Sequence, residues 1–283
     1  MELSNRQEIS RILASDGFTF KKSLGQNFLV DPTVCPAMAE AACDGETGVL
    51  EIGPGAGVLT VELAARAKRV LAIELDERLR SVLEKTTRGF DNVSFLFQDV
   101  MKVDLAAVIR EHFADCKRVT VAANLPYYIT SPIVMQLLES RLPVDSITVM
   151  VQKEAAERFC APVGSRAAGA VTVAIAYFAE SEMLFSVPRD CFYPAPKVDS
   201  AVIRLTVRST PPVTVHDEKK FFSLVKGCFA QRRKTLLNTV SNTVGIPKEE
   251  LRAALAALGL PETVRGETLT LEQLAALHNQ LSE

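Results

Sequence analysis

The chain has 283 residues, 48% of them hydrophobic, and a formal net charge of −2 at pH 7. This is enough apolar sequence to bury a full core in one large domain, or in a large and a small one. No apolar run is long enough to span a membrane, and the first twenty residues lack the apolar core of a signal peptide, so we expect a cytoplasmic protein.

Cysteine and histidine are scattered along the chain. The six cysteines stand singly, without a Cys-x-x-Cys pair, and the three histidines are isolated. This spacing argues against a zinc site or a disulfide framework, and it suits a reducing cytosol. We therefore expect no metal cofactor.

Strands and helices alternate through the first part of the chain. Apolar runs predict strands, and a segment with helical spacing follows each of them. The predicted strands are 49–52, 69–75, 93–98, a run ending at Asn124, and 146–152; the predicted helices are 58–67, 76–87, 104–113, one with Ser131 as N-cap and Pro132 in its first turn, and one starting at Lys153. This alternation predicts an α/β fold with a parallel, doubly wound, Rossmann-like sheet.

The pattern changes after about residue 180. The stretch 183–207 contains Pro188, Pro194 and Pro196, and it predicts antiparallel strands around a proline-braced loop. Thr210-Pro211-Pro212 indicates a linker, and the apolar spacing beyond it predicts a small α-helical domain. We expect one domain over 1–208, with an N-terminal extension over 1–47, and a second over 213–283.

A glycine-rich turn, Gly53-Pro54-Gly55-Ala56-Gly57, joins the first predicted strand to its helix. Its glycines let the backbone approach a ligand closely at a helix N-terminus. A dinucleotide-binding turn would have its third glycine where this chain has Val58. With Glu51 just before the turn, the pattern favours S-adenosylmethionine over a pyrophosphate, because a carboxylate opposes the ligand's ammonium or sulfonium and repels a diphosphate.

Two more acidic residues stand at predicted strand ends. Glu74 ends the second strand, 21 residues after Gly53 (74 − 53), and Asp99 follows the third. A carboxylate in the first position can accept hydrogen bonds from both ribose hydroxyls, and Asp99 could accept one from the adenine amino group of the cofactor. Either acid alone would more often be a helix cap or a loop residue. Three acids in order at strand ends favour a cofactor site.

The tetrapeptide Asn124-Leu125-Pro126-Tyr127 follows an apolar run, Val119 to Ala123, and therefore ends a strand. Ligands bind at that edge of open α/β sheets. The Asn124 amide oxygen and the Leu125 carbonyl can accept both hydrogens of an exocyclic amino group, while Tyr127 stacks on the base. Pro126 fixes its own φ and biases Leu125 toward an extended conformation, which aims that carbonyl. Taken alone, the tetrapeptide is equally consistent with a turn that closes a strand.

Basic residues cluster in two places although the chain is mildly acidic. Lys21 and Lys22 lie near the start, and Arg232-Arg233-Lys234 lies late in the sequence. A local basic face can bind phosphates whatever the net charge. A run of three basic residues is more often a solvated helix face, so this signal is weak by itself.

An ordered set of motifs resembles the small-subunit ribosomal RNA adenine dimethyltransferases, the KsgA/RsmA or dimethyladenosine transferase family, over nearly the whole chain. The motifs are Lys22–Leu29, Glu51–Gly57, Glu74, Asp99, Asn124–Tyr127, Gln152–Glu154, Phe192–Val202 and Gln231–Leu236. Each motif is weak alone, and the ordered set is highly specific. In one departure, Ala168-Gly169-Ala170 stands where relatives often carry Tyr-Gly-Arg, which leaves open an RNA contact or a packing contact there.

The resemblance implies S-adenosylmethionine as the methyl donor and gives particular residues a role. The cofactor would be contacted by Asn27, Leu29, Gly53, Gly55, Glu74, Asp99 and Asn124. The target adenine would be held by Asn124–Tyr127 and would lie between the rings of Tyr127 and Phe192. RNA phosphates would be bound by Lys21, Lys22, Lys226, Arg232, Arg233 and Lys234.

The activity that the resemblance implies is dimethylation of two adjacent adenosines in the 3′-terminal hairpin loop of small-subunit (16S) rRNA. The partner would be this rRNA in immature 30S particles, and the protein would act in subunit biogenesis. Residues 1–208 would then form the methyltransferase domain and 213–283 a helical domain that binds RNA or the ribosome. We expect a monomer without a membrane partner.

Parts of the sequence would also suit three other functions. Large-subunit rRNA adenine methyltransferases of the antibiotic-resistance type share the first domain, but the Gln231–Leu236 element argues against them. A DNA adenine methyltransferase would need a separate target-recognition region, which we do not find between the strands. A non-catalytic assembly or transcription factor could keep the fold, although intact cofactor and Asn124–Tyr127 motifs argue against loss of activity.

Overall fold

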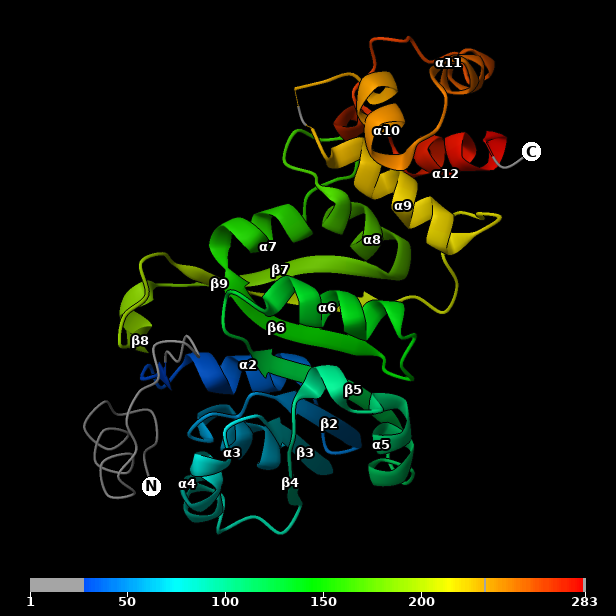
Figure 1. The fold of residues 1–283 in the computed structure, drawn as a ribbon. Helices are drawn as coiled ribbons and strands as arrows, with labels where there is room; N and C mark the ends of the chain where they lie inside the picture. Colours follow the sequence, from blue (N-terminus) through cyan, green and yellow to red (C-terminus); the bar gives the residue numbers. More distant parts are fainter. Residues whose placement is uncertain (1–27, 232, 282–283) are drawn as a thin grey trace. The chain divides into compact units, whose positions relative to one another are not determined.

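The computed structural model describes residues 28–231 and 233–281 (Figure 1). These residues divide into two compact units. The first contains the described residues up to Ala156 together with Glu182–Val207. The second contains Glu157–Ser181 and the described residues from Arg208 onward, so it takes in a segment of the middle of the chain as well as the C-terminal helices.

A mixed sheet forms the centre of the first unit. Among the described residues its strand order is β4-β3-β2-β5-β6-β9-β7. The strands are β2 (Thr47–Ile52), β3 (Arg69–Glu74), β4 (Val93–Phe97), β5 (Arg118–Asn124), β6 (Ser146–Gln152), β7 (Ala179–Val187) and β9 (Ser200–Val207). The pairs from β4 to β6 are parallel, and β9 runs antiparallel to β6. The predicted parallel, doubly wound sheet and the late antiparallel strand are confirmed.

The strand order reverses at one point of the sheet. From β2 the chain builds outward through β3 and β4, and it then returns to place β5 and β6 on the other side of β2. Open α/β sheets bind ligands in the crevice beyond the carboxyl ends of the strands at such a switch point. The carboxyl ends of β2 and β5 are Ile52 and Asn124, which places the glycine turn and the Asn124–Tyr127 tetrapeptide at this crevice.

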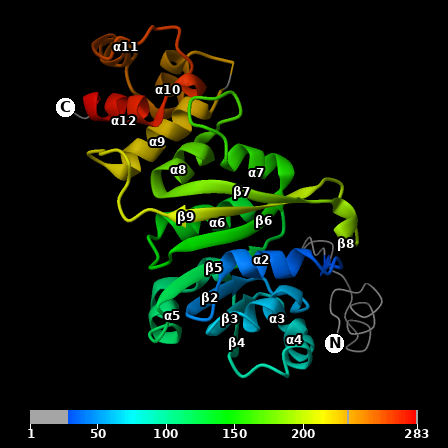
Figure 2. The same cartoon turned by 180° about the vertical axis from the view of Figure 1, so that it is seen from behind.

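Helices cover both faces of this sheet, as the fully buried residues of β2 require. In the first unit they are α2 (Val34–Ala42), α3 (Val58–Ala64), α4 (Arg80–Thr86), α5 (Leu105–His112), α6 (Thr130–Glu139) and the start of α7 (Lys153–Phe159). Side chains of α2, α3 and α4 pack in one hydrophobic core cluster with Val49 of β2, Val70 of β3 and Ala122 of β5. Figures 1 and 2 show α3 and α4 on one side of β2 and β3, and α5 on the other.

The start of α6 differs from the prediction. The helix begins at Thr130 with Ile129 in the N-cap position, so the prediction of Ser131 as N-cap is wrong by two residues. The turn that follows the tetrapeptide already forms at Pro126, whose carbonyl accepts a hydrogen bond from the Ile129 N–H at 3.1 Å and one from the Thr130 hydroxyl at 3.2 Å. Pro132 still falls in the first helical turn, where a missing N–H costs nothing.

A short antiparallel ladder between β1 (Phe28–Leu29) and β8 (Phe192–Tyr193) was not predicted. It pairs Leu29 with Phe192, and the Val30 N–H donates to the Cys191 carbonyl at 2.8 Å. Strands of two residues carry no periodicity, which is why the sequence did not indicate them. The ladder ties the proline-braced loop to the segment that precedes α2.

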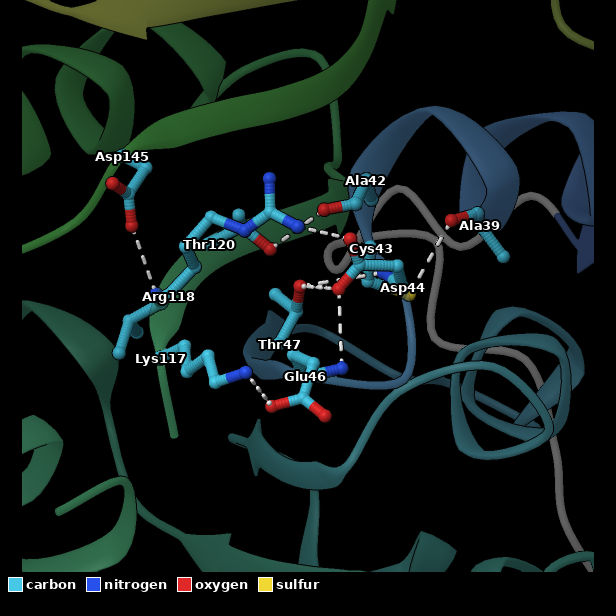
Figure 3. A network of polar contacts seen from close by, with 11 residues as sticks. Ala39, Ala42, Cys43, Asp44, Glu46, Thr47, Lys117, Arg118, Thr120 and Asp145 are labelled. Atoms are coloured by element: carbon cyan, nitrogen blue, oxygen red, sulfur yellow. Dashed lines mark hydrogen bonds and ion pairs between the residues drawn. The ribbon is translucent and has the colours of Figure 1, made fainter. Parts of the chain in front are cut away.

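Polar contacts join the amino ends of β2 and β5, at the edge of the sheet opposite the switch point (Figure 3). The Asp44 carboxylate accepts hydrogen bonds from the Thr47 hydroxyl at 2.8 Å and from the Glu46 N–H at 3.1 Å, and it pairs with Arg118. Lys117 pairs with Glu46 at 3.1 Å. Exposed ion pairs stabilise little. These pairs lie where the two parallel strands begin, with Thr47 opposite Arg118.

The second unit is helical. It contains α8 (Ala170–Phe178), α9 (Glu218–Phe229), α10 (Leu236–Val244), α11 (Lys248–Ala257) and α12 (Leu271–Gln280). The rings of Tyr177, Phe178, Phe221 and Phe222 pack with centroids 5.0–5.7 Å apart. The predicted C-terminal helices are confirmed. Within residues 28–231 and 233–281, no helix is long and apolar enough to cross a membrane.

The Ala168-Gly169-Ala170 departure lies at the start of α8. The Ala168 side chain is fully buried, and Gly169 occupies the N-cap position. The Thr172 hydroxyl accepts a hydrogen bond from the Gly169 N–H at 2.9 Å and donates one to the Arg158 carbonyl at 2.6 Å. Small residues therefore fit a packed helix start, and the departure is accommodated within the second unit.

Candidate active site

A pocket opens at the carboxyl edge of the first unit's sheet, at the switch point. Its lining includes five elements of sequence that were singled out above: Glu51 with the glycine turn, Glu74, Asp99, Asn124–Tyr127 and Phe192. Leu29 also lines it, through the β1–β8 ladder. The fold therefore gathers the described catalytic and cofactor-binding candidates, which lie up to 163 residues apart (192 − 29), around one cavity.

The three glycines of the turn adopt backbone conformations that residues with a side chain rarely adopt. Gly53, Gly55 and Gly57 have φ values of +71°, +58° and +86°. A Cβ on Gly57 would lie 2.7 Å from the Thr86 hydroxyl oxygen, whereas the space beside Gly53 is open. The Gly53 N–H donates to the Ile73 carbonyl at 2.9 Å, which anchors the turn to β3 and leaves room for a ligand next to it.

Glu74 at the end of β3 is buried, with 7% of its surface exposed, and it holds the turn in place. Its Oε2 accepts a hydrogen bond from the Gly55 N–H at 3.2 Å, and its Oε1 accepts one from the Asp76 N–H at 2.8 Å. Burial raises the pKa of this carboxyl above its usual value, and the backbone N–H groups oppose the shift. Each oxygen has a second lone pair, so the carboxylate can also accept from a diol in the pocket.

Asp99 has two roles in the structure. It is the N-cap of a short 3₁₀ helix (Val100–Lys102), where its Oδ1 accepts a hydrogen bond from the Met101 N–H at 3.0 Å. It is also half-buried and part of the pocket lining. Capping therefore holds the Asp99 carboxylate beside the pocket, where the sequence predicts an adenine amino group.

Glu51 is the most buried acid of the pocket, with 1% of its surface exposed. Its Oε2 has no hydrogen-bond partner among the described residues, and the buried Thr60 hydroxyl has none either. Burial raises the pKa of the Glu51 carboxyl to about 8, and the negative charge of Glu74 adds to the shift. A buried acid without a hydrogen-bond partner is costly to ionise, and a cationic ligand in the pocket would supply the missing partner.

The tetrapeptide lines the same pocket from the end of β5. Asn124 pairs with Met150 of β6 as the last residue of β5, and Leu125 is buried. Tyr127 is half-buried, and its hydroxyl lies 2.8 Å from the Ser200 hydroxyl at the start of β9. Phe192, with 4% of its surface exposed, lines the same pocket from β8.

The predicted RNA-binding residues are not part of this pocket. Lys226 is exposed on α9, and Arg233 and Lys234 are exposed between α9 and α10, all in the second unit. Four predicted site residues lie outside the described part of the chain: Lys21, Lys22, Asn27 and Arg232. Among the described residues, no group of three or more His, Cys, Asp or Glu side chains comes together to hold a metal ion.

Three pocket residues were missed as individual site candidates. Glu51 was noted only as part of its motif, and the acid before the glycine turn was the signal for it. Leu75 and Tyr128 line the pocket with 58% and 60% of their surface exposed. Large exposed apolar and aromatic side chains at a pocket mouth indicate a binding surface, but exposure cannot be read from the sequence.

Comparison with known proteins decides the family. The model of the family described as "Ribosomal RNA adenine dimethylase" matches residues 17–282. The chain belongs to this family. It is 51% identical over 274 residues to the ribosomal RNA small subunit methyltransferase A of Geobacillus thermodenitrificans, with 95% of this chain and 94% of the relative covered. The corresponding protein of Bacillus pumilus is 47% identical over 276 residues, with 96% and 94% covered.

Solved structures agree with this family assignment. A dimethyladenosine transferase from Plasmodium falciparum is 28% identical, with a TM-score of 0.72, and the match covers 88% of this chain and 95% of that one. The 23S rRNA methyltransferase ErmE is also 28% identical, with a TM-score of 0.67, and the match covers 90% and 100%. The predicted family and Rossmann-like fold are confirmed. The adenine dimethylase is thus an rRNA methyltransferase that uses a methyl donor of the S-adenosylmethionine type.

Proposed function

We propose that this dimethylase transfers methyl groups from S-adenosylmethionine to the exocyclic amino nitrogens of two adjacent adenosines in the 3′-terminal hairpin loop of 16S rRNA. It would act on immature 30S particles in the cytoplasm, as a monomer. The observation that carries the proposal is that the glycine turn with Glu74 and the Asn124–Tyr127 tetrapeptide line one pocket. A donor site and an acceptor site that share a cavity allow direct transfer between them.

The acidic residues of the pocket suit this cofactor. Glu74 would accept from the ribose hydroxyls, Asp99 from the adenine amino group, and Glu51 from the ammonium of the amino acid part. Gly53, Gly55, Leu29 and Asn124 would contact the cofactor as well, together with Asn27 outside the described residues. The unpaired Glu51 oxygen is the feature that a cationic ligand explains best.

The residues around the target base would make its amino nitrogen reactive. This nitrogen is a poor nucleophile because its lone pair is delocalised into the ring. The Asn124 amide oxygen and the Leu125 carbonyl would accept its two hydrogens and favour a pyramidal nitrogen with a localised lone pair. The cofactor supplies the methyl group on a positively charged sulfur. Asn124 and Leu125 would hold the nitrogen toward it, and positioning of this kind provides much of the rate.

No strong general base is required in this scheme. The amino hydrogen becomes acidic only after the new carbon–nitrogen bond has formed, and water can then accept the proton. Tyr127 and Phe192 would sandwich the adenine, and base–aromatic stacking contributes about 1–3 kcal/mol per base. That gain offsets the cost of taking a base out of its stack, which is smallest in a loop.

The comparisons favour the small subunit over the alternatives. The bacterial relatives at 47–51% identity are named as small-subunit methyltransferases. The large-subunit enzyme ErmE is 28% identical. A non-catalytic assembly factor would not need a pocket that keeps Glu51, Glu74 and the tetrapeptide together.

The proposal is tested by mapping the modified nucleosides. The protein is incubated with labelled S-adenosylmethionine and immature 30S particles, and the rRNA is digested and analysed. We expect dimethyladenosine at two adjacent positions of the 3′-terminal hairpin. Asn124→Ala should suppress transfer and leave cofactor affinity largely intact. Label confined to large-subunit rRNA would overturn the substrate assignment, and full turnover by Asn124→Ala would overturn the role of the amide.

The RNA contacts need a separate test. Replacing Lys226, Arg233 and Lys234 by glutamine should lower RNA affinity and reduce the slope of log K against log salt by about 0.7 for each lost phosphate contact. Lys117→Gln is the matched control, since Lys117 is exposed at the opposite edge of the sheet from the pocket. An unchanged slope in the triple variant would mean that these residues are only solvated.

A further inference from the structure

The ring of Tyr127 is held at its far end by a buried serine. The Tyr127 and Ser200 hydroxyl oxygens are 2.8 Å apart, and Ser200 is fully buried as the first residue of β9. In the sheet Ser200 lies opposite Gln152 of β6, so its position is fixed by the backbone ladder. Burial raises the pKa of the Tyr127 phenol, and the Ser200 hydroxyl opposes that shift. The phenol therefore remains neutral and able to donate to Ser200.

The same segment of chain carries another residue of the pocket lining, Phe192. Phe192 lies eight residues before Ser200 (200 − 192) and pairs with Leu29. The loop between them is closed by the Asp199 carboxylate, which accepts from the Arg189 N–H at 3.1 Å, and by the Asp199 carbonyl, which accepts from the Lys153 N–H at 3.0 Å. Both ends of the segment 189–200 are thus attached to the sheet or to β1.

We propose that Ser200 is a positioning residue that sets the Tyr127 ring at the stacking distance from Phe192. The proposal rests on the function given above. A flat base between two rings needs a spacing of about 7 Å, twice the optimal carbon–carbon separation of about 3.5 Å. The Tyr127 backbone fixes one end of its ring, and the hydrogen bond to Ser200 fixes the other. Because Ser200 and Phe192 belong to one closed segment, this bond links Tyr127 to the segment that carries Phe192.

A purely structural role makes a different prediction. If the bond only satisfies two polar groups, its loss changes stability and leaves the reaction of folded protein as it was. If it positions the ring, its loss lowers kcat and weakens stacking of the base, while cofactor affinity stays unchanged. Measurements on folded protein at saturating cofactor separate these two cases.

The experiment is a double-mutant cycle with Ser200→Ala, Tyr127→Phe and the double variant. Methyl transfer to 30S particles gives kcat and KM, and calorimetry gives cofactor affinity. Stacking is followed with a hairpin RNA that carries 2-aminopurine at the target position, whose fluorescence is quenched between aromatic rings. The chain has no tryptophan, so the protein background is low. Thr148→Val is the control, because Thr148 is a fully buried sheet residue whose hydroxyl has no partner among the described residues.

We expect each single variant to lower kcat by about twofold to tenfold, the loss that follows from one neutral hydrogen bond, and to reduce quenching. The double variant should lose no more than Tyr127→Phe alone, and Thr148→Val should keep wild-type kcat. Wild-type kcat and quenching in both single variants would overturn the proposal, as would losses that multiply in the double variant. If Ser200→Ala does not fold, Tyr127→Phe breaks the same bond without a change in β9.

Failure of this inference is distinguishable from failure of the proposed function. Tyr127→Ala removes the ring itself. If that variant still methylates fully, the stacking role of Tyr127 is wrong, whereas the proposed function fails only if the wild-type protein does not dimethylate the 30S rRNA. If Tyr127→Ala loses activity while Ser200→Ala keeps wild-type kcat, only the role of Ser200 is refuted.

Discussion

Binding of S-adenosylmethionine should release a proton from Glu51. In the free protein this carboxyl is buried, and burial raises its pKa to about 8. The neighbouring groups do not stabilise the ionised form of Glu51. Glu74 repels a second negative charge, and Cys35 of α2 is a buried thiol whose own pKa is raised. At neutral pH the free protein therefore holds Glu51 mainly as the neutral acid. A cationic ligand favours the carboxylate and expels the proton.

The size of the effect follows from this pKa. At pH 7 a group with a pKa of about 8 is about 0.9 protonated, and at pH 9 about 0.1. If the bound ammonium keeps Glu51 ionised, each cofactor that binds at pH 7 should release about 0.9 proton. At pH 9 the release should fall to about 0.1, because most of the carboxyl is then ionised before the cofactor binds.

Calorimetry in buffers of different ionisation enthalpy measures this number directly. The slope of the observed binding enthalpy against the buffer ionisation enthalpy is the number of protons released. Glu51→Gln is the control, since its amide does not titrate. The cofactor's own amino group, with a pKa near 8, is already mostly protonated at pH 7 and can take up only about 0.1 proton on binding, so the difference between the slopes at pH 7 reports mainly Glu51.

A second measurement tests the same carboxyl without the cofactor. The folded protein binds the Glu51 proton more tightly than the unfolded chain, for which the pKa is near 4.5. The free energy of unfolding therefore falls as the pH rises from about 4.5 to about 8, by about 3 kcal/mol at pH 7. Glu51→Gln should remove this loss and be more stable than wild type at pH 7. Equal proton release by both proteins, or equal pH dependence of unfolding, would refute the reasoning.

Three further predictions concern single sites. Gly266→Ala should lower the free energy of unfolding of the second unit by about 1–3 kcal/mol, measured by urea denaturation, because its Cβ would lie 2.6 Å from the Cys228 carbonyl oxygen. Burial lowers the pKa of His278, so the folded form is neutral, and stability should fall below about pH 6.5 by at most about 1.4 kcal/mol per pH unit, a dependence absent from His278→Gln. Glu74→Gln should weaken cofactor binding, measured by calorimetry, although glutamine is as large as glutamate. Both oxygens of Glu74 accept hydrogen bonds, one of them from the Gly55 N–H, whereas an amide nitrogen only donates.

The strands and the strand-end residues were predictable because their signals are local. The run before Asn124 and the residues of β2 are apolar over the length of a strand, and the strands end where polar or glycine residues begin. An alternating order of strands and helices then allows few topologies. Once the sheet is doubly wound, the carboxyl ends of β2 and β5 must meet at the switch point, so Gly53 and Asn124 could be assigned to one site.

The contacts that complete the site were not predictable, because each joins residues far apart in sequence through short or irregular segments. Phe192 was assigned only from the resemblance, and its pairing with Leu29 uses two strands of two residues. Tyr127 and Ser200 lie 73 residues apart, and nothing in either local sequence indicates their hydrogen bond. The grouping of Glu157–Ser181 with the C-terminal helices likewise depends on tertiary packing.

The pocket of the first unit is lined by acidic side chains, whereas basic side chains are exposed on the second unit. The described lining of the pocket includes the carboxyl groups of Glu51, Glu74 and Asp99, and none of its residues is a lysine or an arginine. An acidic cavity attracts a cationic cofactor and repels phosphate, so a neutral base can enter while the RNA backbone is held outside. The exposed Arg233 and Lys234 of the second unit supply the opposite charge. If these basic residues contact phosphate as proposed, a protein with net charge −2 can bind RNA, because they and the pocket carboxyl groups belong to different units.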